Sequence, residues 1–90
     1  MFSISISIED SKVVGMIEID SYFFEPSKYD YAFYLYRNDE RVDIKWYTSE
    51  INAIFNLESK NGVFYIKAFI RDIEQGNIRK FNSEKISIDS

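Results

Sequence analysis

Strict alternation of apolar and hydroxyl side chains runs through the first residues of the chain. Residues 2–8 read Phe-Ser-Ile-Ser-Ile-Ser-Ile. Successive side chains of a β-strand point to opposite faces of the sheet, so this pattern gives one apolar face and one serine face. We therefore predict a strand that buries Phe2, Ile4, Ile6 and Ile8 and turns its three serines outward.

The composition extends this preference to the rest of the chain. Fourteen Ile, seven Tyr and eight Phe stand against two Leu and three Ala. β-Branched and aromatic side chains pack well on a pleated, half-buried surface. The chain is therefore predicted to be all-β.

Polar turns separate about seven predicted strands. The clearest turn is residues 58–62, because its Asn-Gly pair tolerates the positive φ that a tight reversal between antiparallel strands requires. Residues 48–50 break the pattern, and an alternative is that Ser49 caps a short helix. The predicted strands span residues 2–8, 13–20, 31–37, 42–47, 51–57, 63–72 and 78–88.

Two segments need a more specific prediction. Residues 21–30 contain the only proline and lack a period, so we expect a loop in which Tyr22, Phe23 or Phe24 covers an edge of the core. In residues 42–47 the alternation places Ile44 and Trp46 on one face and two charged residues, Asp43 and Lys45, on the other.

Strands of this number and spacing predict a two-sheet fold. We expect one immunoglobulin-like, fibronectin type III-like, Greek-key β-sandwich over residues 1–90, excised from a larger protein.

Hydrophobic content of 46% and charged content of 29% exclude a disordered tail. No apolar run approaches the roughly 20 residues of a membrane helix, and no basic segment opens a signal peptide. We therefore expect no membrane insertion.

The residue types also exclude most enzyme chemistry. The chain has no His and no Cys, which removes disulfides, thiol nucleophiles, histidine bases and zinc sites built on those ligands. The carboxylate groups Glu18 with Asp20, and Asp39 with Glu40 and Asp43, are interpreted as solvated surface charge. The three glycines stand apart, so no phosphate-binding loop is predicted. We expect no enzyme activity, no cofactor and no metal.

The formal net charge is −4, from 15 acidic and 11 basic residues. Nucleic-acid binding depends on cations that neutralise phosphates, and this charge opposes it. We therefore predict no nucleic-acid partner.

An aromatic pattern in residues 31–76 is similar to that of the triple-tyrosine (Y_Y_Y) domain, a β-sandwich module of bacterial proteins. The family pattern is Tyr-x-Tyr-x-Leu, a Trp, a Gly-x-Tyr strand and an acidic-to-Gly turn. Phe33 and Phe64 stand where the family has tyrosine. The positions of this chain that correspond to the pattern are Tyr31, Phe33, Leu35, Trp46, Gly62 and Phe64.

This resemblance implies an accessory role, in sensing, spacing or binding, with no catalytic residues. It also implies a periplasmic, extracellular or cell-surface location. These six positions are predicted to form the core signature of the domain.

Three further tyrosines form the candidate surface. If the sheet buries Tyr31, Phe33, Leu35 and Trp46, alternation places Tyr34, Tyr36 and Tyr47 outside as apolar rings with hydroxyl rims. Such rings stack on sugars or anchor a protein. The alternative is that they form cross-strand pairs that only stabilise the sheet.

We therefore predict a non-catalytic accessory or interaction module of a larger bacterial protein. Its partners would be neighbouring domains or another protein, and the alternative is a carbohydrate-binding module that binds glycans. A third possibility is assembly, because an edge strand at residues 2–8 presents serines rather than lysines and could accept another strand. Charges at Glu9, Asp10 and Lys12 blunt the end of that edge.

Overall fold

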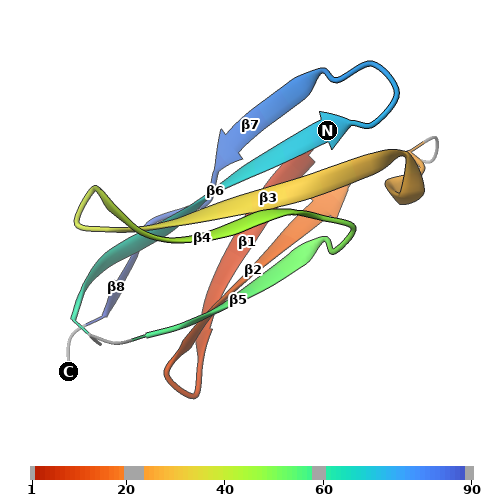
Figure 1. Ribbon diagram of the computed structural model, residues 1–90. Coiled ribbons are helices and arrows are strands. Elements are labelled where there is room, and N and C mark those ends of the chain that lie inside the picture. Colours follow the sequence, from red (N-terminus) through yellow and green to blue (C-terminus); the bar gives the residue numbers. More distant parts are fainter. Residues whose placement is uncertain (1, 20–23, 58–60, 89–90) are drawn as a thin grey trace.

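The computed structural model describes residues 2–19, 24–57 and 61–88, and they form two antiparallel sheets packed face to face (Figure 1). The all-β sandwich predicted from the sequence is confirmed. One sheet has the strand order β1-β2-β5, with bounds Phe2–Glu9, Lys12–Ile19 and Asn52–Asn56. The other has the order β4-β3-β6-β7, with bounds Glu40–Thr48, Tyr29–Arg37, Gly62–Asp72 and Ile78–Asn82, and β8 (Ile86–Ile88) also pairs with β6.

The two tightest hairpins, β1–β2 and β3–β4, each close through two residues at positive φ. Asp10 and Ser11 have φ of 48° and 64° between β1 and β2, and Asn38 and Asp39 have φ of 51° and 64° between β3 and β4. Positive φ at both central residues matches the twist of the flanking strands. Asn and Asp tolerate this conformation better than most residues. The sequence therefore marks both hairpins with residues other than glycine.

The predicted tight reversal at residues 58–62 is wrong in its topology. Gly62 begins β6, and β6 pairs with β3, whereas β5 belongs to the other sheet. The segment therefore joins two sheets, and residues 58–60 lie outside the described part. Gly62 has φ of +137°, and a Cβ there would lie 3.0 Å from Nε of Arg37. Glycine is needed at this position for conformation and for space.

The core lies between the two inner faces. The alternation of residues 2–8 is confirmed: Ile4 is buried, Phe2, Ile6 and Ile8 pack against the core, and the serines are exposed. Pro26–Lys28 forms a short 3-10 helix before β3, and Phe24 packs on the core edge, while Tyr22 and Phe23 lie outside the described residues. The buried hydrophobic residues are Ile4, Val13, Ile17, Tyr31, Ala32, Phe33, Leu35, Ala53, Phe55, Phe64, Ile66, Ala68 and Ile70.

Ser83 explains why the described chain has eight strands where about seven were predicted. The segment from residue 78 to residue 88 runs along one edge of β6, but it is divided into β7 and β8. Between them the Ser83 hydroxyl accepts a hydrogen bond from the Ile66 N–H at 2.8 Å and donates one to the Glu84 carbonyl at 2.8 Å. The Ser83 N–H donates to the Ile66 carbonyl at 2.8 Å. A side chain thus takes the place of a backbone acceptor, and the strand ladder is interrupted.

Ser83→Ala is expected to lower the free energy of unfolding by about 1–3 kcal/mol, because it leaves the buried N–H of Ile66 without its acceptor. Urea denaturation followed by circular dichroism measures this change. Ser87→Ala, on the exposed side of β8, is the matched control and should change stability by less than about 0.5 kcal/mol. Equal effects of the two variants would contradict the role given to Ser83.

Candidate functional site

The outer face of the five-stranded sheet carries cross-strand pairs of large side chains. Because β3 and β6 pair without a register shift, Tyr36 lies opposite Tyr65 and Tyr34 lies opposite Lys67. The Tyr36 and Tyr65 rings are stacked, with centroids 4.7 Å apart and an interplanar angle of 1°. The Tyr34 ring lies 4.6 Å from the Phe69 ring at an angle of 58°. Such contacts contribute about 0.5–1.5 kcal/mol each beyond burial.

Cationic side chains cover several of these rings. The Arg71 guanidinium lies 4.0 Å from the centroid of Tyr47, and the Arg41 guanidinium lies 5.1 Å from that of Tyr34. Tyr34, Tyr36 and Tyr47 are all half-buried. The three predicted surface tyrosines therefore share one face, but each ring is packed against a neighbour and none is an open platform.

A β-bulge brings Tyr47 to this face. Tyr31 pairs with Thr48 and Phe33 pairs with Lys45, so two residues of β4, Trp46 and Tyr47, lie opposite Ala32. An extra residue in one strand changes which side chains face outward. Strict alternation could not predict this displacement.

The prediction that Trp46 belongs to the core is wrong. Its exposed fraction is 63%, and its ring makes an edge contact with Tyr47 at 5.4 Å. Trp46 lies on β4, an edge strand of the wider sheet, on which only Tyr47 is half-buried and every other residue is exposed. Ile44, predicted on the same face as Trp46, pairs with the outward Tyr34 and is also exposed. Alternation separates two faces of a strand but does not say which one meets the core.

The other positions of the predicted core signature lie inside the sandwich or at its edge. Tyr31, Phe33, Leu35 and Phe64 have exposed fractions of 2% or less. Gly62, at the start of β6, is half-buried.

Tyr31 combines a buried ring with a bonded hydroxyl. The hydroxyl donates a hydrogen bond of 3.0 Å to the carbonyl oxygen of Pro26, which ties the 3-10 helix to β3. Burial raises the pKa of Tyr31, and the neighbouring Tyr29 and Asp30 raise it further. The hydroxyl is therefore protonated at neutral pH and serves as a structural donor.

An ion pair lies at one end of the ring-covered face. Arg71 donates from Nε to Oδ1 of Asp30 at 3.0 Å and from a terminal nitrogen to Oδ2 at 2.5 Å. These hydrogen bonds raise the pKa of Arg71 above its ordinary value. Burial raises the pKa of the adjacent Tyr47, although Arg71 acts in the opposite direction. The forked geometry holds the guanidinium over the Tyr47 ring.

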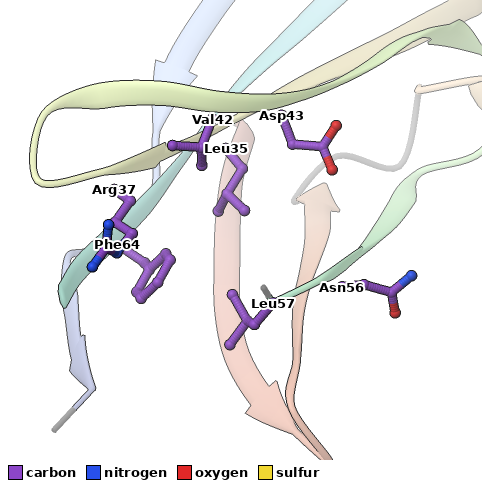
Figure 2. A pocket seen from close by; sticks show the side chains of 7 residues that line it. All are labelled: Leu35, Arg37, Val42, Asp43, Asn56, Leu57 and Phe64. Atoms are coloured by element: carbon purple, nitrogen blue, oxygen red, sulfur yellow. The ribbon is translucent and has the colours of Figure 1, made fainter. Parts of the chain in front are cut away.

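A pocket of about 290 Å³ opens between the sheets where β4 faces the end of β5 (Figure 2). Its charged groups are already engaged. The Arg37 Nε donates to the Asn61 carbonyl at 2.6 Å, and Oδ1 of Asp43 accepts from the Ile44 N–H at 2.8 Å. Acid–base catalysis needs a second titratable group in a different environment, and the lining supplies no second carboxylate. The lining residues are Leu35, Arg37, Val42, Asp43, Asn56, Leu57 and Phe64.

The acidic residues do not converge on a metal site in the described part of the chain, which contains no group of three or more potential His, Cys, Asp or Glu ligands. Asp39 approaches Lys85 at 3.6 Å on the surface. Glu18 is exposed on β2, and Asp20, its predicted neighbour, lies outside the described residues. No helix in the described part of the chain is long and apolar enough to span a membrane.

Sequence reasoning missed several members of this face: Arg41, Tyr65, Phe69 and Arg71. The alternation in residues 63–72 did separate Tyr65, Phe69 and Arg71 from the buried row. What it lacked was the register of β3 against β6 and β4, which decides which ring meets which cation.

Comparison of the chain with protein-family models, with curated proteins and with solved structures finds no match.

Trp46, the only tryptophan of the chain, should report its exposed position directly. We expect red-shifted fluorescence emission from the folded protein, ready quenching by acrylamide, and little further shift on unfolding, because the indole already contacts water. A double variant that combines Trp46→Phe with Tyr31→Trp, Phe33→Trp or Leu35→Trp would give the emission of a buried indole as the reference. A blue-shifted spectrum that resists quenching in the unaltered protein would contradict the placement of Trp46.

The raised pKa of Tyr31 predicts a loss of stability in alkali. The pKa of Tyr31 is higher in the folded state than in the unfolded state. The stability that its protonated hydroxyl contributes is therefore fully present below about pH 10 and is lost as pH rises through the folded-state pKa. Tyr31→Phe should cost about 0.5–1.5 kcal/mol at neutral pH, and this gap should narrow above pH 10. Urea titrations at several pH values test this, with Tyr36→Phe as the control for a hydroxyl of the outer face. A gap that stays constant with pH would contradict the assignment.

Proposed function

We propose that this chain is a non-catalytic interaction module that docks through the outer face of its five-stranded sheet. The observation that carries the proposal is the exposed Trp46, placed beside Tyr47 and Arg71 on a packed and ordered face. Trp, Tyr and Arg are the residues most enriched at the energetic centres of protein interfaces. Rings that are already stacked lose little conformational freedom on binding, which favours affinity.

The charge of this face indicates the chemistry of the partner. Its cations are Arg41, Lys67, Arg71, Lys80 and Lys85, as the strand register and the ring contacts place them. Among the described residues, the carboxylates of Asp30 and Asp39 lie on this face and are paired with Arg71 and Lys85. The whole chain has a formal charge of −4, so positive charge is concentrated here. An acidic protein surface, from a neighbouring domain or another protein, would complement it.

The arrangement of the strands also supports a module of fibronectin type III-like kind. Seven strands divided between two sheets, with Greek-key connections, characterise immunoglobulin-like sandwiches. Here β4 pairs beside β3 on the wider sheet, and β7 with β8 continues the edge of β6. We keep the triple-tyrosine resemblance, the bacterial origin and the surface or periplasmic location as parts of this proposal.

Carbohydrate binding is the second candidate, and Trp46 is the observation that favours it. It is the most exposed large hydrophobic side chain in the described part of the chain, so its ring can stack on a sugar without displacing a neighbour. Titration of its fluorescence with bacterial cell-wall oligosaccharides tests this candidate. A saturable shift that Tyr34→Ala or Tyr36→Ala abolishes would favour the glycan module, and an unchanged spectrum would exclude these sugars as ligands.

Site-specific photocrosslinking tests the protein-docking proposal. We would place p-benzoylphenylalanine at position 46, and in a control at position 16, where Met16 is 43% exposed on the other sheet. We expect one recurrent protein adduct from position 46 that weakens with salt, because screening reduces the attraction of the cationic face. Adducts of equal yield from both positions, or none from position 46, would contradict the proposal.

Binding measurements with the partner identified by crosslinking would then show which side chains contribute to the binding free energy. Trp46→Ala is expected to weaken binding by about 2 kcal/mol or more, as at an interface hot spot. Arg41→Glu should weaken it and flatten its salt dependence, whereas the same charge reversal at Lys12, exposed on β2, should not. If neither Trp46→Ala nor Arg41→Glu changed the affinity, the partner would bind at another surface.

A further inference from the structure

β1 is a long, regular edge strand with one unpaired side. It runs over eight residues and pairs with β2 from Phe2 to Glu9 without a register shift, and no other strand of the described part of the chain lies beside it in the sheet. Figure 1 shows β2 beside it on one side only. A free edge of this kind presents unpaired N–H and C=O groups to a further strand.

The hairpin geometry identifies the groups that are free. Glu9 and Lys12 close a two-residue hairpin and are therefore the hydrogen-bonded pair. Since bonded and non-bonded positions alternate, the backbone of the serines is directed to β2. The backbone N–H and C=O groups of Ile4, Ile6 and Ile8 are directed to the open edge.

The other sheet edges have structural features that hinder pairing with a further strand, and β1 lacks these features. β4 carries two register shifts, and Asp43 and Lys45 face inward opposite Leu35 and Phe33. β5 has only five residues. The edge formed by β7 and β8 is interrupted at Ser83. Bulges, inward charges and short strands all prevent edge-to-edge pairing, whereas β1 has no bulge, no proline and no charge before Glu9.

A hollow of about 420 Å³ lies along this open edge. It is bounded by Ser3, Ile4, Ser5 and Ile6 of β1 and by Asn82 and Glu84 at the interruption between β7 and β8, with Glu18 completing the lining. Ile6 and Ile8 of the inner row are only half-buried. An added strand would occupy this space and cover apolar surface that the sandwich leaves partly open.

The sequence of β1 specifies the strand that fits. Residues 3–7 read Ser-Ile-Ser-Ile-Ser, which is the same in both directions. Antiparallel pairing of this segment with a second copy of itself opposes serine to serine and isoleucine to isoleucine, with Ser5 at the two-fold axis. No charged residue lies in the paired segment, so like charges do not oppose each other.

We propose that β1 is a self-association site at which two copies of this chain pair edge to edge, giving a continuous sheet of the order β5-β2-β1-β1-β2-β5. The pairing is isologous, so each copy uses its single unprotected edge and the assembly closes as a dimer. The dimer leaves the outer face of the five-stranded sheet free. Self-association and docking through Trp46 are thus independent properties.

Sedimentation equilibrium over a wide range of concentration tests the proposal. The wild-type chain should show a reversible monomer–dimer equilibrium. Ser5→Lys places two ammonium groups beside the two-fold axis and should raise the dissociation constant at least about tenfold, equivalent to about 1.4 kcal/mol. Asn52→Lys adds the same charge to β5, the opposite edge of the same sheet, and should leave the equilibrium unchanged.

Crosslinking gives a second measurement that does not depend on affinity. The chain has no native cysteine, so Ser5→Cys should oxidise to a disulfide-linked dimer faster than Asn52→Cys does. A wild-type chain that stays monomeric, or equal responses of position 5 and position 52, would overturn the proposal. Trp46→Ala should leave the dimer intact, and its loss in that variant would assign association to the outer face instead.

Discussion

The pairing of β3 with β6 is the interaction on which the other features of this molecule depend. It runs from Tyr29 to Arg37 without a register shift. On the inner side it aligns Phe33 with Ala68 and Leu35 with Ile66, and all four side chains are buried in the close-packed core. On the outer side the same register places Asp30 opposite Arg71 and Tyr36 opposite Tyr65. One ladder therefore determines both the packing of the core and the composition of the candidate docking face.

That outer face stabilises the sheet and is also the surface proposed to recognise a partner. Tyr36 stacks on Tyr65 and Asp30 pairs with Arg71, and Ala32 is buried on this side of the sheet although it points away from the core. Such a face resembles the packed centre of an interface before a partner arrives. Trp46 is the exception, because the edge position of β4 leaves it in water. Its exposure costs hydrophobic free energy that a partner would recover.

The four sheet edges divide into protected and unprotected ones for reasons visible in each strand. β4 turns charged residues inward and is bulged, β5 is short, and Ser83 breaks the edge beside β6. β1 combines full length with regular pairing. The chain thus offers two separate surfaces, one made of side chains and one made of backbone groups.

The sequence by itself determined the all-β class, the alternation of β1 and the buried row of β6, because a period of two follows from backbone geometry alone. It also determined the absence of His and Cys chemistry. Only the tertiary structure decided that Trp46 lies outside, that residues 58–62 join two sheets, and that Ser83 divides the last strand. These depend on the width of each sheet, on bulges and on the pairing of distant strands. No local pattern encodes them, since alternation distinguishes two faces without naming the one that meets the core.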